Sequence, residues 1–305
     1  MLNEMQDEIR RLAMEKHCLI LAHNYQRPEI QDIADFVGDS LDLARKAKSA
    51  NTECILFCGV DFMAETAAIL NQDKKVVVPN TNAKCPMAAM LQKRTLIEAK
   101  KAHPDAAVML YVNTSAEAKA EADVVCTSAN AIEVARAIPE KKILFGPDEN
   151  LVHYVSKRVR EKEFIPVPPH GYCIVHKKLI VMDSIHHLLA EHPDAVVFAH
   201  PECNPDIQEA AHYILSTNGM VAKAKELPNK KFIIATESGL LHRLQREIPG
   251  KRFYGISGAI CAAMKTNTLG DVYRALVEMR PIVAVQPEIA ERACKSIDRM
   301  LAISG

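Results

Sequence analysis

The sequence repeats with a period of about 88 residues, and this period constrains the fold more than any other feature. Cys85, Cys173 and Cys261 mark it, since 173 − 85 = 88 and 261 − 173 = 88. Solenoid repeats are shorter, at roughly 20–50 residues. A period of this length therefore has the size of a small domain, and each copy would place a thiol at the same relative position.

Three stretches of the chain can be aligned with one another at this period. They are LILAHNYQRPEIQDIADFVGDS, VMLYVNTSAEAKAEADVVCTSAN and VVFAHPECNPDIQEAAHYILSTNGM. Each begins with a short apolar run, which is typical of a buried parallel strand. The polar residue that ends this run is His23, Tyr111 or His200.

Three further apolar runs follow in each copy. The second ends 17 residues after the first, at Ser40, Ser128 or Thr217. The third is CILFCG, KILFGP or FIIATE, and the fourth is KVVVPN, EFIPVP or RFYGIS, after which a cysteine closes the copy. Four short apolar runs with helical segments between them predict four parallel strands joined by crossover helices.

The predicted fold class is α/β, with three pseudo-symmetric, three-layer αβα domains around a central active site. Each domain would hold a short parallel four-stranded sheet. The expected boundaries are 1–103 for the first repeat with an N-terminal helix, 104–191 for the second, 192–280 for the third, and 281–305 for a C-terminal strand or helix that packs back on the repeats.

The composition is that of an ordinary globular protein, with 49% hydrophobic and 25% charged residues. A formal net charge of zero argues against nucleic acid or an anionic membrane as a partner. No apolar run approaches the ~20 residues of a membrane span. Leu2, Met5, Ile9 and Leu12 predict an amphipathic helix, in a segment too charged for a secretory signal. We therefore expect a cytoplasmic protein.

Nine cysteines in a chain without an export signal argue against a disulfide framework, because cytosolic thiols stay reduced. The chain has no C-x-x-C pair, so a local zinc knuckle is not expected. Cys203 lies in the motif HPEC and has no counterpart in the other copies. The cysteines expected to be small buried apolar residues are Cys18, Cys54, Cys58, Cys126 and Cys294.

The three repeat cysteines predict a metal centre. Ligands bind beyond the carboxyl ends of parallel strands, so three domains that face one another there would share one cavity. Three thiolates select zinc or an iron–sulfur cluster, and three ligands leave one iron of a cubane cluster open as a Lewis acid. Two alternatives stay open: a zinc hydrolase or lyase with a metal-bound water, and a non-catalytic carrier or sensor of clusters.

The hydroxyl residues at the ends of the second strands have two interpretations. Ser40 and Ser128 would be N-caps of the helices that follow. Alternatively, three helix N-termini with their hydroxyls would bind anions. The copies also differ at matching places, since Tyr25 follows His23 by two residues and Glu202 follows His200 by two. Such divergence suits one asymmetric substrate in a pseudo-symmetric cavity.

Several long motifs resemble the quinolinate synthase A family. They are LAHNYQRPEIQDIADFVGDS, GVDFMAE, YVNTSAEAKAEADVVCTSAN, HPEC and MKTNTL, and the match runs nearly end to end. The resemblance implies three analogous α/β domains around a 4Fe–4S cluster held by three cysteines. It implies an enzyme that condenses iminoaspartate with dihydroxyacetone phosphate to quinolinate, with loss of phosphate and water, in NAD biosynthesis. It also implies functional coupling to an enzyme that produces iminoaspartate.

The resemblance implies roles for individual residues. The cluster ligands would be Cys85, Cys173 and Cys261. The substrate contacts would be His23, Ser40, Tyr111, Val112, Asn113, Ser128, His200, Pro201, Glu202 and Thr217. Glu202 would be the general acid/base, with a pKa raised by burial, assisted by His200 and Tyr25. One departure is Tyr172, which stands beside Cys173 where the family pattern commonly has histidine.

Overall fold

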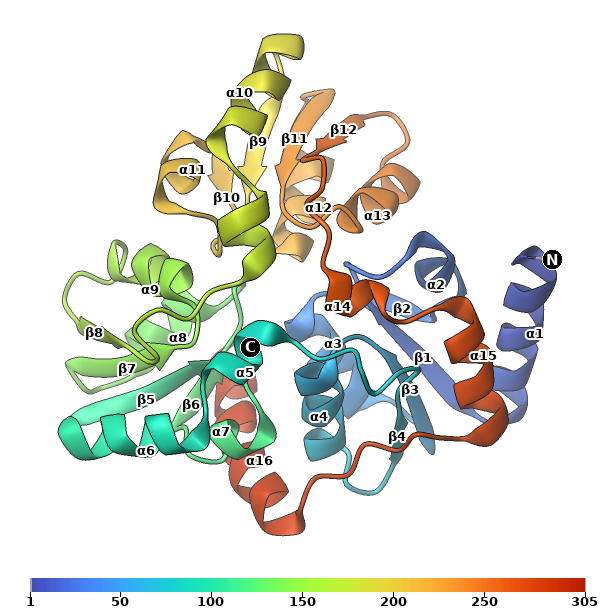
Figure 1. Ribbon diagram of the computed structural model, residues 1–305, viewed down its shortest axis with the longest axis horizontal. Coiled ribbons are helices and arrows are strands. Elements are labelled where there is room, and N and C mark those ends of the chain that lie inside the picture. The colour runs from blue at the N-terminus through green and yellow to red at the C-terminus, as the bar shows by residue number, and fades with distance from the viewer. Residues whose placement is uncertain (1, 305) are drawn as a thin grey trace.

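The computed structural model describes residues 2–304 and contains three parallel four-stranded sheets with the same strand order, arranged around a common centre (Figure 1). The orders are β2-β1-β3-β4, β6-β5-β7-β8 and β10-β9-β11-β12. The strands are β1 (Cys18–His23), β2 (Phe36–Gly38), β3 (Cys54–Cys58), β4 (Lys75–Val77), β5 (Ala106–Tyr111), β6 (Val124–Cys126), β7 (Lys142–Gly146), β8 (Glu163–Pro166), β9 (Val196–Ala199), β10 (Tyr213–Ile214), β11 (Lys231–Ala235) and β12 (Arg252–Gly255). The predicted α/β class with three similar units is confirmed.

Helices connect the strands and cover the sheets (Figure 1). They are α1 (Leu2–Glu15), α2 (Pro28–Ile33), α3 (Ser40–Ser49), α4 (Asp61–Leu70), α5 (Pro86–Met90), α6 (Lys93–Ala102), α7 (Ala116–Lys119), α8 (Ala131–Ala137), α9 (Glu149–Ser156), a π-helical turn (Val175–Leu179), α10 (Met182–Glu191), α11 (Pro205–Ala210), α12 (Thr217–Glu226), α13 (Leu240–Glu247), α14 (Ala262–Lys265), α15 (Leu269–Glu278) and α16 (Pro287–Ile303). Proline begins α2, α11 and α16, where its fixed φ suits the first helical turn.

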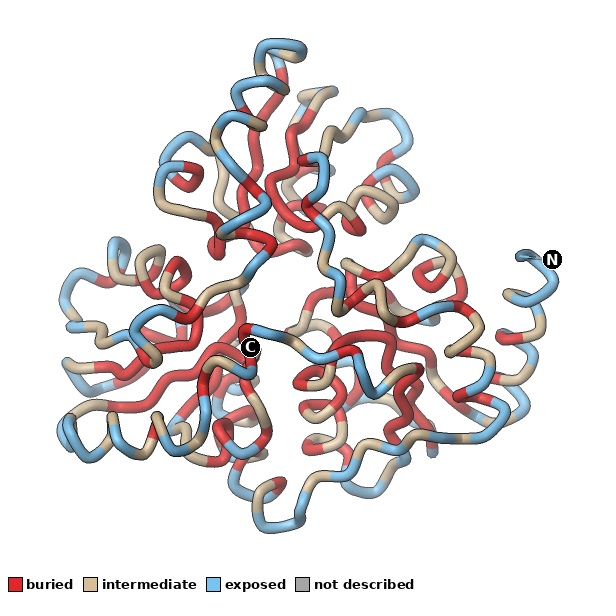
Figure 2. Tube along the Cα trace, viewed as in Figure 1, coloured by how far each residue is buried: buried red, intermediate tan, exposed pale blue. Residues whose placement is uncertain are grey.

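The cores of the units follow from the apolar runs of their strands. Figure 2 shows that most strands are buried along their length, whereas the outer helices alternate between buried and exposed residues. The predicted N-terminal amphipathic helix is α1, in which Ile9 is buried while Leu2 and Met5 stay 57% and 40% exposed. The predicted apolar face is therefore only partly covered.

The C-terminal segment packs against the first and second units. Val283 N–H donates to the carbonyl of Val76, and Val78 N–H donates to that of Pro281, in an antiparallel bridge beside β4. Ile297 and Met300 of α16 are buried in the core that the first two sheets share. The strands of each sheet come from one of the predicted ranges, and the domain boundaries stay a prediction.

One pair of cysteines departs from the expectation of reduced thiols. Cys18 and Cys54 are buried as expected, but a disulfide joins them. The parallel register of β1 and β3 sets the two residues side by side, with their Cα atoms 4.4 Å apart. That separation lies within disulfide range. No helix within residues 2–304 has both the length and the apolar character needed to cross a bilayer.

Candidate active site

One cavity lies where residues of all three units converge. The space between protein atoms in this cavity is about 690 Å³ and is partly open to solvent. The predicted site residues on its wall are His23, Tyr25, Ser40, Cys85, Tyr111, Asn113, Ser128, Cys173, His200, Glu202, Thr217 and Cys261. Val112 and Pro201 are buried next to Tyr111 and His200 without lining it.

Chain direction explains why these residues meet. His23 and Tyr111 are the last residues of β1 and β5, and His200 follows β9 directly. Every strand in each sheet is parallel to its neighbours, so all strands of a sheet end at the same edge. The first strand of each unit therefore ends at the carboxyl edge of its own sheet. The cavity lies at that edge, as the strand pattern predicts.

Three thiols reach the cavity from the loops that follow the fourth strands. Cys85 and Cys261 directly precede α5 and α14, and Cys173 lies two residues before the π-helical turn. Burial raises the pKa of Cys85 to about 12 and raises that of Cys173 and Cys261. Cys261 further raises the pKa of Cys85, and Cys85 further raises that of Cys173. Thiolates are therefore costly here unless a metal binds them. Three soft donors on one buried wall fit a thiolate-bound metal centre.

Glu202 is the centre of a buried polar cluster. Its Oε2 lies 2.6 Å from Nδ1 of His176 and 3.6 Å from Nδ1 of His200. Burial opposes ionisation of this carboxyl, but the contact with His176, aided by a hydrogen bond from Tyr111, overcomes that effect and lowers its pKa to about 2. The expectation of a raised pKa for Glu202 is therefore wrong, because His176 is close enough to hold the carboxylate in its charged form.

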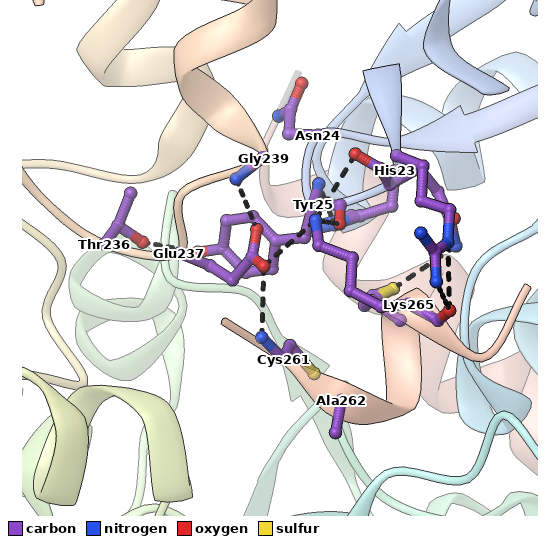
Figure 3. Close-up of polar contacts among 12 residues, drawn as sticks. His23, Asn24, Tyr25, Thr236, Glu237, Gly239, Cys261, Ala262 and Lys265 are labelled. Atoms are coloured by element: carbon purple, nitrogen blue, oxygen red, sulfur yellow. Dashed lines mark hydrogen bonds and ion pairs between the residues drawn. The ribbon is translucent and has the colours of Figure 1, made fainter. Parts of the chain in front are cut away.

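A chain of hydrogen bonds runs from this carboxylate to Tyr25. His176 Nε2 lies 2.9 Å from Oγ1 of Thr236. That oxygen lies 2.7 Å from Oη of Tyr25 (Figure 3). His176 Nδ1 also lies 3.2 Å from Sγ of Cys173. Burial raises the pKa of Tyr25 well above its ordinary value, so its phenol stays protonated. Glu202, a cysteine thiol and a phenol are thus connected through His176 and Thr236.

Sequence reasoning missed both His176 and Thr236. His176 lies three residues after Cys173. Thr236 directly follows the third strand of its unit, at the same sheet edge as the other site residues. The sequence signal for both residues was their position close to motif residues. The contact between His176 and Thr236 depends on how two separate segments pack, and the sequence does not show this.

The helix caps differ from those expected. Asp39 caps α3, and its Oδ1 accepts the N–H groups of Leu41 and Asp42. The N-cap of α8 is Asn130, so neither Ser40 nor Ser128 is an N-cap. The hydroxyls of Ser40 and Ser128 are therefore not used in capping.

Two of the hydroxyls contact residues of other units. Ser128 Oγ lies 3.1 Å from Nε2 of His200. Thr217 follows the N-cap residue of α12, and its Oγ1 accepts a 2.7 Å bond from Nδ2 of Asn24. Arg243 Nη1 donates to Oδ1 of Asn24 at 2.7 Å, so a cation supports this junction of the first and third units.

Both predicted histidines of the site are neutral. Burial lowers the pKa of His23 and of His200 to about 3 in each case. A neutral imidazole has one donor and one acceptor nitrogen. His200 therefore bridges Ser128 and the Glu202 region as a neutral side chain.

The fold and the cavity define a class of protein, an α/β enzyme in which three similar units share one thiol-lined site. A family model described as Quinolinate synthetase A protein matches residues 7–302. The chain belongs to this family, and its activity is that of a quinolinate synthase in NAD biosynthesis. The family resemblance seen in the sequence motifs is confirmed.

Curated relatives match over nearly the whole chain. The quinolinate synthase of Pyrococcus furiosus is 51% identical over 302 residues, which is 99% of this chain and 98% of that protein. Those of Thermococcus kodakarensis and Methanothermobacter thermautotrophicus are 50% and 48% identical, over 98% and 100% of both chains. A solved diphosphate reductase from Plasmodium falciparum, titled E-1-hydroxy-2-methyl-but-2-enyl-4-diphosphate reductase, aligns over 90% of this chain and 94% of its own at 9% identity, with a TM-score of 0.33 too low to support a conclusion.

Proposed function

We propose that this chain condenses iminoaspartate with dihydroxyacetone phosphate and releases quinolinate, phosphate and water, with a 4Fe–4S cluster on Cys85, Cys173 and Cys261. The observation that carries the proposal is the presence of one thiol from each unit on the wall of a single cavity, beside Glu202 and His176. When bound, the cluster would supply a Lewis-acidic iron that has no protein ligand.

The hydroxyls hold the substrate anions. The two substrates carry carboxylates and a phosphate, and Ser40, Ser128 and Thr217 enter the cavity from three different units. Ser40 and Thr217 are the first residues of α3 and α12, where the helix dipole favours an anion. Tyr111, Asn113 and His23 on the same wall orient the reacting atoms.

Glu202 accepts protons during the condensation and the later loss of water. Its lowered pKa leaves it ionised, and the contact with Nδ1 of His176 at 2.6 Å fixes its position. Tyr25 is protonated and is bonded through Thr236 to His176. Its phenol donates a proton to the substrate oxygen that leaves as water or that becomes the oxygen of an enol. His200 stays neutral and fixes the position of Ser128.

The test is an anaerobic preparation assayed for iron, sulfide and quinolinate. We expect a brown protein with about four irons and four sulfides per chain that forms quinolinate from an iminoaspartate source and dihydroxyacetone phosphate. A colourless protein that contains zinc would favour the hydrolase or lyase alternative. A brown protein without quinolinate formation would favour the non-catalytic carrier. Cytoplasmic location and coupling to an iminoaspartate-producing enzyme stay predictions.

A further inference from the structure

Three carboxylates occupy the same place in the three units, at the turn after the third strand. They are Asp61 after β3, Asp148 after β7 and Glu237 after β11. Each accepts a hydrogen bond from the backbone N–H of the cysteine in its own unit. The N···O distances are 2.9 Å for Cys85, 3.0 Å for Cys173 and 3.0 Å for Cys261.

Each carboxylate is itself held in place by the turn that carries it. A second backbone N–H, from the start of the following helix, donates to each of them. These donors are Phe62 at 2.9 Å, Leu151 at 2.7 Å and Gly239 at 2.7 Å. The side chain therefore links the helix start to the cysteine loop in all three units.

A backbone bond fastens each cysteine loop at a second point. In each unit an N–H of the third-strand turn donates to the carbonyl two residues before the cysteine. The pairs are Asp61 with Ala83, Glu149 with Gly171, and Ser238 with Ala259, each at 2.9 Å. We call the side-chain bond and this backbone bond together the cysteine clamp. The clamp recurs in three units whose other site residues have diverged.

The clamps of the second and third units are the more deeply buried. Asp148 and Glu237 are 1% and 0% exposed, and burial of a carboxylate is costly unless it is bonded. Glu237 also pairs with Nζ of Lys265 at 3.0 Å, and this ammonium donates to the carbonyl of Tyr25 at 2.6 Å (Figure 3). The third clamp is thus continuous with the loop that carries Tyr25.

We propose that Asp61, Asp148 and Glu237 are positioning residues that hold the three cysteine loops in the geometry needed to bind the metal centre. The inference rests on the proposed cluster at these cysteines. Partners that orient metal ligands slow the release of the metal, because ligands that are already fixed have less freedom to move away. The three carboxylates accept the backbone N–H groups of the cysteines, and this positioning role is distinct from the proton transfer assigned to Glu202.

The geometry predicts that replacing the carboxylate by an amide weakens some of the three cysteine clamps and not others. Asp61 receives both of its backbone bonds on one oxygen, Oδ1, so Asp61→Asn can keep both through its carbonyl oxygen. Asp148 and Glu237 use one oxygen for the helix start and the other for the cysteine. In Asp148→Asn and Glu237→Gln, an amide NH₂ must face a backbone N–H.

The test follows cluster loss from anaerobically reconstituted protein after addition of an iron chelator, by the decay of visible absorption. We expect Asp61→Ala, Asp148→Asn and Glu237→Gln to lose the cluster about tenfold faster than the unsubstituted protein. Asp61→Asn should lose it at the unsubstituted rate. Circular dichroism and urea unfolding of the cluster-free variants show whether each chain is folded.

Asp123→Ala is the matched control. Its carboxylate accepts the N–H of Val108 at 2.7 Å, at the amino end of the second sheet and away from the cysteine loops. This variant should lose stability without faster cluster loss. If folded Asp61→Ala, Asp148→Asn and Glu237→Gln all release iron at the unsubstituted rate, the clamps have no positioning role. If the unsubstituted protein takes up no cluster, the proposed function fails instead.

Discussion

Nδ1 of His176 lies 2.6 Å from Oε2 of Glu202, and both side chains are at most 4% exposed. This contact decides which form of Glu202 the cavity holds. Without a close histidine, burial would raise the pKa of the carboxyl, whereas in the structure its pKa falls to about 2. Glu202 is therefore ionised and able to accept a proton.

Glu202→Gln should remove most of the turnover while leaving the cluster in place. The substitution keeps the shape of the side chain but removes the proton acceptor, so we expect kcat to fall by about 10²–10⁴. Anaerobic quinolinate assays and iron content give the two readouts. Glu209→Gln, at an exposed residue paired with Lys157, is the control and should keep full activity. Near-normal kcat in Glu202→Gln would exclude its role in proton transfer.

Thr236→Val should interrupt the connection between His176 and Tyr25. Valine has nearly the shape of threonine but cannot bridge Nε2 of His176 and Oη of Tyr25. We expect kcat to fall about tenfold with little change in KM. Thr236→Ser keeps the hydroxyl and should restore most of the activity. Equal rates in the serine and valine variants would show that the hydroxyl has no part in the reaction.

Ser128→Ala should weaken substrate binding. Its hydroxyl is not an N-cap and contacts His200, so its loss should raise KM for one substrate about three- to tenfold. Ser156→Ala, in α9, removes a hydroxyl that donates to the carbonyl of His153 in its own helix at 3.0 Å. That control should leave KM unchanged. An unchanged KM in Ser128→Ala would limit this serine to a structural role.

Replacement of any one repeat cysteine by serine should abolish the iron–sulfur absorption of anaerobic protein. Each of Cys85, Cys173 and Cys261 would supply one of three protein ligands, and none of the three could be spared. Cys126→Ser, at a buried cysteine of β6, tests whether loss of any buried thiol has the same effect. A full cluster in one of the three repeat-cysteine variants would remove that residue from the ligand set.

The protein should lose stability as the pH falls below about 6.5. Burial lowers the pKa of His23 and His200 to about 3, from an ordinary value of 6.5. Between these values the unfolded chain binds two protons that the folded protein does not, so acid favours unfolding, by about 1.4 kcal/mol per pH unit for each histidine. Urea titrations of cluster-free protein between about pH 7 and pH 5 measure this slope.

The His23→Asn variant separates this effect from general acid denaturation. It removes one of the two neutral histidines and should reduce the pH dependence of the unfolding free energy by about half. A slope equal to that of the unsubstituted protein would mean that His23 is protonated in the folded state.

Much of the fold was predictable because strand signals are local. The apolar runs that end at His23 and Tyr111 are β1 and β5, and the run before His200 is β9. The 88-residue period and the apolar runs also predicted that the repeat cysteines follow the fourth strands, as they do in the structure. The disulfide between Cys18 and Cys54 was not predictable, since it depends on the register between two strands that lie 36 residues apart in the chain.

The candidate site was predictable in its members and less so in its contacts. Tyr25, Cys85 and Glu202 line the cavity as expected. The link from Glu202 through His176 and Thr236 to Tyr25 joins residues separated by 60 and 211 positions. No periodic pattern reports which side chains meet across units, because that depends on how the units pack.

By itself, the sequence determined the three repeats, the four strands in each, and the edge at which the thiols and polar residues collect. These features follow from hydrophobic periodicity and chain direction, which are properties of short segments. Only the tertiary structure decided the helix caps, the partner of Glu202 and the sign of its pKa shift. Protonation depends on the balance of burial and neighbouring charge at one point in space, and that balance exists only once the three units have packed together.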